Sequence, residues 1–463
     1  MGILRYTPEQ ADVTDWIMDN DGILLVEAGA GTGKSFISRC IVGLLRPKSG
    51  IYTAFNKAIV EEGIDRFNGT SIECKTFHAL AYRYVKPKLP IQVFNYKTIT
   101  EKVVYSEKRK IITALDEFFV SSSTCMDDYF EKRFKEHPRC DYMVEICTKY
   151  IHGMVDNEIN PTFNFMLKYL HLMLVEKTIN IDVDIVILDE INDVTAVSLE
   201  IFKLINAPKK LGLGETNQAI YGFLNLVNGF KELADVATTM KFTQSYRCSE
   251  DIANRITEKM QEVLDKDFIF LGTDKPVQND LTLYCTSTNA AIVDKIYDRI
   301  NQNKGFTLLR SISEIFAAPL AVLSASQGKR PYQKKYEYLL DLHDEFKKQS
   351  GIKGYFKFLQ EELDDEEINN AVKLLMKLNS QNVSLFEVYK KAKNAKSDKS
   401  YTISTVFTAK GLEFETVEIS DDLNHQFQKA CKGDMDQEAA LTTIRCYYVA
   451  CSRAGVNLQN SVL

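Results

Sequence analysis

The chain has 463 residues, with 57 Lys+Arg against 63 Asp+Glu and a formal net charge of −6. Its composition, 45% hydrophobic and 26% charged, excludes a mostly disordered chain, a collagen-like repeat and a small disulfide scaffold. No stretch approaches the roughly 20 consecutive apolar residues of a membrane span, so we expect no membrane partner. The chain start lacks a signal-peptide core and the ten cysteines form no Cys-x-x-Cys pair, which predicts a reducing, cytoplasmic location. The acidic balance argues weakly against nucleic-acid binding by long-range attraction.

Strand and helix patterns alternate over the first part of the chain. Apolar runs predict buried strands at residues 23–27 and 50–54, and helical apolar spacing follows each of them, at 35–45 and 57–67. Alternation of this kind predicts a parallel α/β sheet.

The strand pattern is interrupted twice by helical stretches. Charged and aromatic residues alternate at helical spacing from about 84 to 179, and another helical stretch runs from about 312 to 396. Strand patterns resume at 181–188, 281–284 and 401–407. We therefore predict an α/β fold of two domains, each carrying a mainly helical insertion: 1–83 with 180–240 around the insertion 84–179, and 241–311 with 397–463 around the insertion 312–396.

A glycine-rich turn joins the first predicted strand to the first predicted helix. It reads Ala-Gly-Ala-Gly-Thr-Gly-Lys-Ser from Ala28 to Ser35, with Ala28 where the usual pattern has glycine. Consecutive backbone N–H groups in such a loop form a concave anion site, and glycine allows phosphate to approach closely. Lys34 would reach the β- and γ-phosphates of a nucleotide and Ser35 would ligate Mg²⁺. The phosphate cradle consists of Gly29, Ala30, Gly31, Thr32, Gly33, Lys34 and Ser35.

Two adjacent acids, Asp189 and Glu190, end the apolar run at 181–188. Carboxylates at the end of a buried strand are unfavourable unless they meet a positive charge. Together with the glycine-rich turn, they predict that Asp189 holds Mg²⁺ and that Glu190 deprotonates the attacking water. ATP and Mg²⁺ are the expected cofactors.

With these motifs the chain resembles the superfamily 1 DNA helicases of the UvrD/Rep type, whose motifs follow in order along nearly the whole chain. The resemblance implies two RecA-like P-loop NTPase domains with parallel sheets, ATP between them and single-stranded DNA across their top. It also implies 3′→5′ movement. For the nucleotide, the resemblance implies that Gln10 and Tyr246 contact adenine and that Glu413 contacts ribose. It implies that Gln218 and Arg247 contact the γ-phosphate. Arg247 would be one arginine finger and Arg453 the second.

The resemblance also implies DNA contacts in four segments. Two of the aromatic residues have an alternative interpretation, because Phe55 and Phe77 could instead be core residues. A structural hydrogen bond suits His78 better than metal binding, since no Cys or His stands at ligand spacing from it. The DNA-contacting set is Phe55, Asn56 and Lys57; Thr76, Phe77 and His78; Tyr221 and Phe223; and Thr408 and Lys410.

The chain departs from the family pattern at three positions. Glu215 stands where Asp is usual, Leu224 where Arg is usual, and Asn192 where Gln is usual. The sequences of these motif segments are most similar to those of the F-box DNA helicase branch. Because the first motif begins at Tyr6, we expect no F-box, and we expect a phage or bacterial core version that works in the host cytoplasm if phage-encoded.

The predicted function is an ATP-dependent 3′→5′ DNA helicase and translocase, an ATP hydrolase that acts in replication, recombination or repair. One alternative is a translocase that strips recombinase from single strands and unwinds weakly. Another is a nucleotide-switched DNA-binding protein without motor activity. Expected partners are single-stranded DNA and duplex junctions, with recombinase or single-strand-binding protein as further candidates, and we expect a monomer. The lysine-rich stretch at 390–399 is either a DNA backbone contact or a solvated face.

Overall fold

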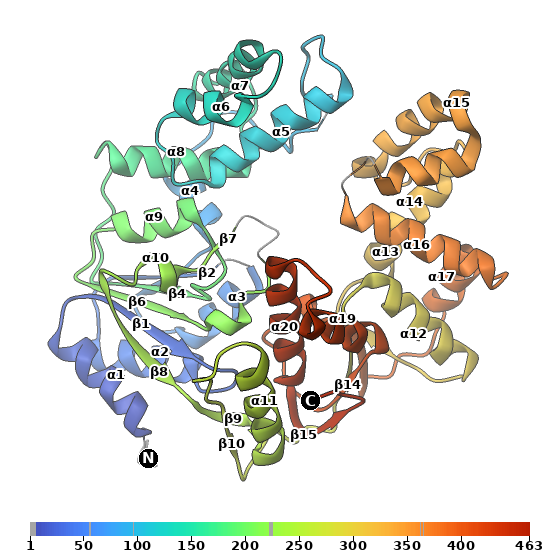
Figure 1. Ribbon diagram of the computed structural model, residues 1–463. Coiled ribbons are helices and arrows are strands. Elements are labelled where there is room, and N and C mark those ends of the chain that lie inside the picture. Colours follow the sequence, from blue (N-terminus) through green and yellow to red (C-terminus); the bar gives the residue numbers. More distant parts are fainter. Residues whose placement is uncertain (1–5, 55–56, 96, 222–225, 362, 364) are drawn as a thin grey trace. The chain divides into compact units, whose positions relative to one another are not determined.

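The structure is a computed structural model that describes residues 6–54, 57–95, 97–221, 226–361, 363 and 365–463. The chain divides into two compact units, Met1–Thr243 (unit 1) and Gln244–Leu463 (unit 2). Each unit has its own parallel sheet, and Figure 1 labels the elements.

Unit 1 is organised around a six-stranded sheet in the order β3-β2-β4-β6-β1-β8. Every pairing within it is parallel. A short antiparallel pair, β5 (Val194–Thr195) with β7 (Leu226–Val227), lies outside it. The sheet strands are β1 (Gly22–Ala28), β2 (Gly50–Ala54), β3 (Ile72–Cys74), β4 (Ile185–Asp189), β6 (Lys209–Gly214) and β8 (Ala237–Phe242).

The two faces of this sheet are buried by different helices. Because successive strand residues point to opposite faces, Leu24 and Val26 of β1 join one core cluster while Leu25 joins another. The first cluster contains side chains of α1 (Pro8–Asp19) and α2 (Lys34–Leu45). On the second face pack α4 (Phe77–Val85), α8 (Phe163–Val175) and α9 (Ala196–Leu204), whereas α3 (Lys57–Arg66) connects β2 to β3.

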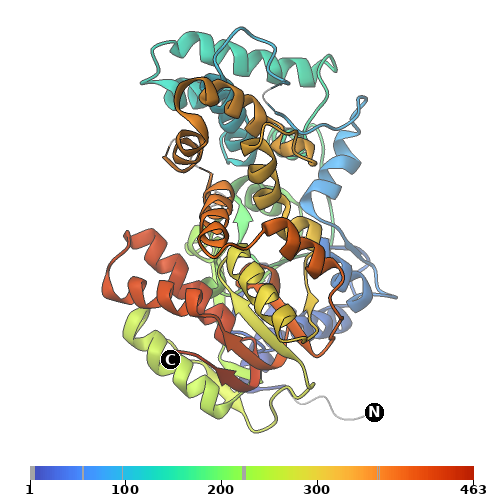
Figure 2. The same ribbon diagram turned by 90° about the vertical axis from the view of Figure 1, so that its right-hand side faces the viewer.

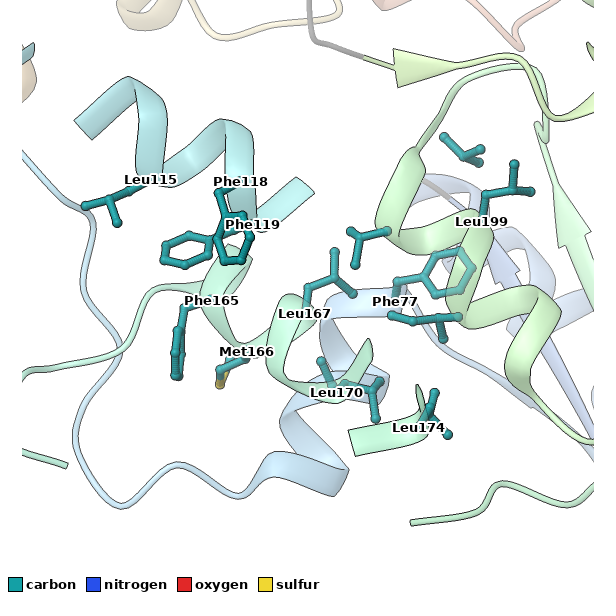
Figure 3. Packing of buried hydrophobic residues seen from close by; sticks show 14 of the residues in the cluster. Phe77, Leu115, Phe118, Phe119, Phe165, Met166, Leu167, Leu170, Leu174 and Leu199 are labelled. Carbon is teal, nitrogen blue, oxygen red and sulfur yellow. The ribbon is translucent and has the colours of Figure 1, made fainter. Parts of the chain in front are cut away.

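The first helical insertion shares the second core cluster. Its helices are α5 (Tyr105–Val120), α6 (Met126–Phe134), α7 (Cys140–Val155) and α8. Aromatic and aliphatic side chains of α5 and α8 interlock, and Phe77 and Leu199 continue the same cluster towards the sheet (Figure 3). The polar residues 121–124 lie between α5 and α6.

Unit 2 has a five-stranded parallel sheet in the order β12-β13-β11-β14-β15. A second pair, β9 (Gln244–Ser249) with β10 (Leu271–Thr273), stands apart from it. Leu283, Ile403 and Val417 are fully buried at the centre of the five-stranded sheet. The sheet strands are β11 (Thr282–Thr286), β12 (Thr307–Leu308), β13 (Tyr401–Thr405), β14 (Phe414–Ile419) and β15 (Ala454–Gln459).

Helices of unit 2 fall into two sets. The second insertion comprises α13 (Ile312–Ile315), α14 (Ala317–Ser326), α15 (Tyr338–Glu361), α16 (Glu366–Ser380) and α17 (Leu385–Lys393). Figure 2 shows these orange helices grouped together within unit 2. The remaining helices are α11 (Glu250–Val263), α12 (Asn289–Asn301), α18 (Val406–Ala409), α19 (Asp421–Lys432) and α20 (Gln437–Cys451).

The predicted fold class, α/β with parallel sheets and helical insertions, is confirmed. Two predicted strands are too long. The strand expected at 181–188 is limited to β4, because Asp182 makes only an isolated bridge with Asn206. The strand expected at 401–407 ends at Thr405, whose hydroxyl caps α18 by accepting from the N–H of Thr408. In the part of the chain that the structure describes, no helix is long and apolar enough to span a membrane.

Candidate functional site

The carboxyl edge of the unit 1 sheet gathers most of the predicted nucleotide-binding residues. In the parallel register, Asp189 of β4 pairs with Ala54 of β2 on one side and with Leu213 of β6 on the other. Glu27 of β1 pairs with Gly214 of β6. The chain therefore leaves these four neighbouring strands at one edge, which is where ligands bind in open parallel sheets.

The glycine-rich turn leaves β1 at this edge and leads directly into α2. Gly31 and Gly33 have φ angles of +71° and +96°, a region that other residues rarely adopt. A Cβ atom on Gly33 would also lie 3.1 Å from Gln10 Nε2. Thr32 closes the turn by donating its hydroxyl to the Gly29 carbonyl at 2.8 Å. The turn is thus built for close approach of an anion to the start of α2.

Lys34 and Glu190 form an ion pair at this edge. Lys34 Nζ lies 3.3 Å from Glu190 Oε1, and the two side chains are 16% and 15% exposed. Glu190 has a φ of +55°, a left-handed conformation that strains a residue with a side chain. Its backbone N–H donates to Asp189 Oδ1 at 3.0 Å. The strained turn therefore holds the carboxylates of Asp189 and Glu190 close together at the sheet edge.

Asp189 and Ser35 are joined by two residues that the sequence did not single out. Asp189 Oδ2 accepts a 2.5 Å hydrogen bond from the hydroxyl of the fully buried Tyr52. Arg66 Nη2 donates to Ser35 Oγ at 2.7 Å, and its Nη1 lies 3.6 Å from Asp189 Oδ2. Burial and the Asp189 carboxylate raise the pKa of Tyr52, so its hydroxyl remains a donor.

Gln10 lies beside the glycine-rich turn with 3% exposure. Its Oε1 accepts from the Thr7 N–H at 3.3 Å, and the Thr7 hydroxyl accepts from the Gln10 N–H at 3.1 Å, which forms the capping box of α1. The Gln10 Nε2 lies 3.5 Å from the Thr32 carbonyl. The structure therefore places Gln10 beside the phosphate cradle, where its side-chain amide contacts the backbone of Thr7 and Thr32.

Gln218 belongs to a buried polar group after β6. It lies in a short 3-10 helix, Thr216–Gln218, and its Nε2 donates to Glu215 Oε2 at 2.5 Å. The side chain of Asn192 accepts from the Glu215 N–H at 2.9 Å. Both Glu215 and Asn192, two of the departures from the family pattern, thus have defined hydrogen-bonding roles.

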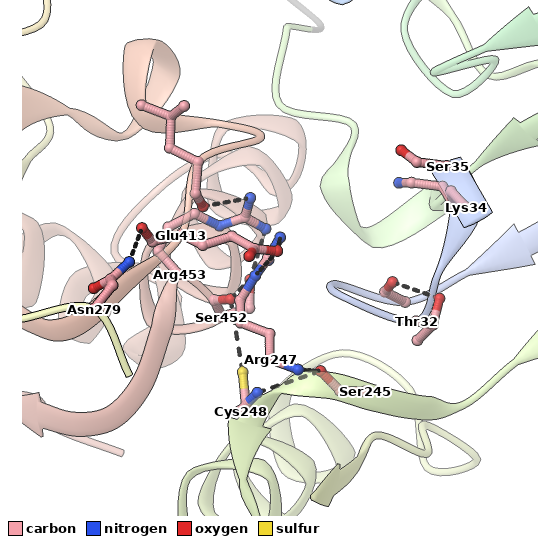
Figure 4. A network of polar contacts seen from close by, with 12 residues as sticks. Thr32, Lys34, Ser35, Ser245, Arg247, Cys248, Asn279, Glu413, Ser452 and Arg453 are labelled. Atoms are coloured by element: carbon pink, nitrogen blue, oxygen red, sulfur yellow. Dashed lines mark hydrogen bonds and ion pairs between the residues drawn. The ribbon is translucent and has the colours of Figure 1, made fainter. Parts of the chain in front are cut away.

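In unit 2, the predicted nucleotide-binding residues Arg247 and Glu413 form an ion pair (Figure 4). Arg247 donates through Nε and Nη2 to Glu413 Oε1 at 3.0 and 2.8 Å, and through Nη1 to the Ser452 carbonyl at 3.0 Å. The Arg247 side chain is 7% exposed and that of Glu413 is 44% exposed. Tyr246, next along β9, is exposed.

Arg453 follows α20 and is almost fully buried within unit 2. Its Nε donates to the Val449 carbonyl at 3.1 Å and its Nη2 to Ser452 Oγ at 3.2 Å. Ser452 therefore contacts both predicted arginine fingers, one through its carbonyl and one through its hydroxyl. The structure brings Arg247, Glu413 and Arg453 together around this serine.

The predicted DNA-contacting residues of the first domain have varied environments. Lys57 is 85% exposed and pairs with Glu61 at 3.1 Å. The Thr76 hydroxyl caps α4 by accepting from Ala79. The side chain of Phe77 is 3% exposed within the core cluster, as the core alternative predicts, and its DNA contact stays a prediction. As the structural alternative predicted, His78 Nε2 hydrogen-bonds Asn164 Oδ1 at 3.1 Å.

The other predicted DNA contacts are only partly described. Tyr221 and Lys410 are half-buried, and Thr408 lies in α18 with its hydroxyl 3.2 Å from that of Thr405. Phe55, Asn56, Phe223 and the unusual Leu224 lie outside the described residues.

Sequence reasoning missed Arg66, Tyr52 and Ser452. A usable signal existed only for Tyr52, since a tyrosine in a fully buried strand needs a partner for its hydroxyl. Arg66 is the last residue of a helix that contains several other charged residues. Nothing in this pattern indicates that the Arg66 side chain reaches Ser35.

Comparison with known proteins gives two matches. The AAA domain family matches residues 16–224, most of unit 1. The chain is 24% identical over 470 residues to F-box DNA helicase 1 of Gallus gallus, an alignment that covers 90% of this chain and 45% of that protein. The chain thus spans about half the length of this curated relative. Both matches support a helicase-like, superfamily 1 relationship for this chain.

Proposed function

We propose that the chain is an ATP-dependent DNA helicase that translocates 3′→5′ on single-stranded DNA. The observation that carries the proposal is the convergence of Lys34, Ser35, Asp189 and Glu190 at the carboxyl edge of one sheet. A cationic amine, a hydroxyl and two carboxylates beside a glycine-rich anion cradle are the groups that phosphoryl transfer to water needs.

The residues present fit a nucleotide with Mg²⁺. The hydroxyl of Ser35 and the carboxylate of Asp189 are oxygen donors, which Mg²⁺ prefers, and one guanidinium already joins them. The metal would supply charge neutralisation on the phosphates. The N–H groups of the turn and the start of α2 would hold the phosphates themselves.

Lys34 and Glu190 would exchange partners during the reaction. In the structure they neutralise each other. When Lys34 turns to nucleotide phosphates, it would no longer neutralise the Glu190 carboxylate, which could then accept a proton from water. Its strained backbone keeps the carboxylate aimed at the sheet edge. Arg247 and Arg453 would stabilise charge that develops on the transferred group.

DNA as the substrate rests on the relative's printed name and on the family resemblance. Among the residues proposed to contact the strand, Lys57 offers an exposed ammonium and Tyr221 a half-buried aromatic ring. Stacking on aromatic rings tolerates every base, which suits a motor that moves along any sequence.

Hydrolysis tests the nucleotide site. In Lys34→Ala and Glu190→Gln we expect DNA-stimulated ATP hydrolysis to fall by at least about 100-fold, since each variant removes a group that acts on the reacting phosphate or water. Matched controls are Lys203→Ala and Glu200→Gln, which break a partly exposed ion pair on α9. These controls should hydrolyse ATP like the wild type. Full activity in either site variant would contradict the site assignment.

Strand displacement tests the direction and the motor. Duplexes with a 3′ or a 5′ single-stranded tail are incubated with the protein, with and without ATP. We expect ATP-dependent unwinding of the 3′-tailed duplex and little unwinding of the 5′-tailed one. ATP hydrolysis without any strand displacement would instead favour a translocase that strips bound protein.

A further inference from the structure

Arg66 is the last residue of α3 and reaches into the proposed nucleotide site. Its side chain is 10% exposed. The guanidinium lies 5.5 Å from the ring centre of Tyr52 and 5.9 Å from that of Phe67. These contacts keep the cation at the sheet edge and away from bulk water.

The guanidinium contacts both proposed metal ligands. It donates through Nη2 to Ser35 Oγ at 2.7 Å, and its Nη1 lies 3.6 Å from Asp189 Oδ2. The same Nη1 donates to the Tyr52 hydroxyl at 3.3 Å, and that hydroxyl donates to Asp189 Oδ2 at 2.5 Å. Arg66 therefore connects Ser35 and Asp189 directly and through Tyr52.

A divalent cation and this guanidinium would compete for the same two oxygens. Arginine stays charged at every accessible pH, so it cannot yield by losing a proton. Two cations close together in a partly buried site repel each other strongly. Arg66 must therefore withdraw for a metal to reach Ser35 and Asp189.

We propose that Arg66 is a resident cation of the metal site, which holds Ser35 and Asp189 in place and is displaced by Mg²⁺ that arrives with nucleotide. The inference rests on the proposed function, which makes Ser35 and Asp189 the metal ligands. The Lys34–Glu190 pair has a parallel role, so each acid of the site has its own cation. Mg²⁺ with nucleotide overcomes this competition because the phosphates supply further oxygen ligands and attract the metal.

The test measures how much Mg²⁺ the protein needs to bind nucleotide. A fluorescent ADP analogue is titrated with Mg²⁺ in the presence of the 463-residue wild-type chain or its Arg66→Gln variant. In the variant, we expect half-maximal binding at an Mg²⁺ concentration lower by about fivefold or more, the size of an ordinary coupling between two ligands. Binding of Mn²⁺ without nucleotide, followed by electron paramagnetic resonance, should become detectable in the variant.

Arg83→Gln is the matched control, because it removes one arginine charge that pairs with Glu73 in the same unit. This control variant should leave the Mg²⁺ midpoint, the Mg²⁺ concentration at half-maximal nucleotide binding, unchanged. If circular dichroism shows that Arg66→Gln does not fold, Arg66→Lys replaces it. A lysine keeps the charge but lacks the planar fork that reaches both oxygens, so its midpoint should also be lower than that of the wild type.

Two results would overturn the inference. One is an unchanged or higher Mg²⁺ midpoint in a folded Arg66 variant. The other is the absence of a Mn²⁺ signal without nucleotide in that variant. If the wild type itself bound no nucleotide, the proposed function would fail instead, so the two failures are distinguishable.

Discussion

Lys168 shows how packing sets the charge of a single residue. It lies in α8 with 2% exposure, and its Nζ donates to the carbonyls of Ser121 and Ser123 at 2.6 and 2.8 Å. The ring of Phe118 lies 4.7 Å away. Burial lowers the pKa of Lys168 to about 7, because the ammonium is poorly solvated there. This lysine holds the turn between α5 and α6 onto α8.

Replacing this lysine should give a pH-dependent loss of stability. Lys168→Met leaves two carbonyls without a donor, which costs about 1–3 kcal/mol. The folded pKa is below the ordinary value of 10.5, so between about pH 7 and 10 the unfolded wild type binds a proton that the folded state does not. Wild-type stability therefore rises through this window, and its advantage over Lys168→Met should be larger at about pH 9 than at about pH 6. Urea unfolding of the wild type and Lys168→Met at both pH values measures this difference in stability. An advantage of equal size at the two pH values would contradict the assignment.

At the scale of elements, α3 and β2 are matched through Gly63 and Tyr52. A Cβ atom on Gly63 would lie 2.5 Å from Tyr52 Cε1. The ring is fully buried and its hydroxyl bonds Asp189, so it cannot move aside without disturbing that carboxylate. The helix thus uses glycine here for close approach to the strand.

Gly63→Ala should lower stability and hydrolysis together. Alanine favours the helix by up to about 1 kcal/mol, but overpacking against the ring costs about 1–3 kcal/mol. Gly43→Ala on α2 is the control, since nothing lies within 4 Å of its added Cβ, and it should gain about 0.5–1 kcal/mol. Denaturant unfolding and ATP hydrolysis of both variants measure the contrast. Equal stability of the two variants would show that the ring adapts without loss.

Sequence patterns predicted the elements better than their contacts. The predicted strand at 50–54 coincides with β2, and helix α13 begins at Ile312, where the second helical pattern starts. Both follow from local hydrophobic period, which depends on neighbouring residues alone. Phe77 could not be assigned in this way, because an aromatic residue at a helix start packs inward or outward according to which helices lie above it. Here α8 and α9 belong to the cluster that buries it.

For the whole molecule, the net charge of −6 limits how DNA can be held. Many phosphate contacts would make binding tight and strongly dependent on salt. We expect modest affinity for single-stranded DNA without nucleotide, with a shallow dependence of affinity on salt. Fluorescence anisotropy at several salt concentrations measures the slope. A slope equivalent to about ten or more neutralised phosphates would contradict this expectation.

The sequence by itself determined the glycine-rich turn, the two acids, the α/β fold class and the helical insertions. Each of these depends on residues that are adjacent or regularly spaced along the chain. Only the tertiary structure decided which side chains meet. Tyr52 and Asp189 are 137 positions apart and come together because β2 and β4 are neighbours in the sheet. Arg66 at the end of α3 and Ser35 in α2 are 31 positions apart and likewise meet only in the folded chain. Such contacts depend on strand order and helix placement, which no local pattern specifies.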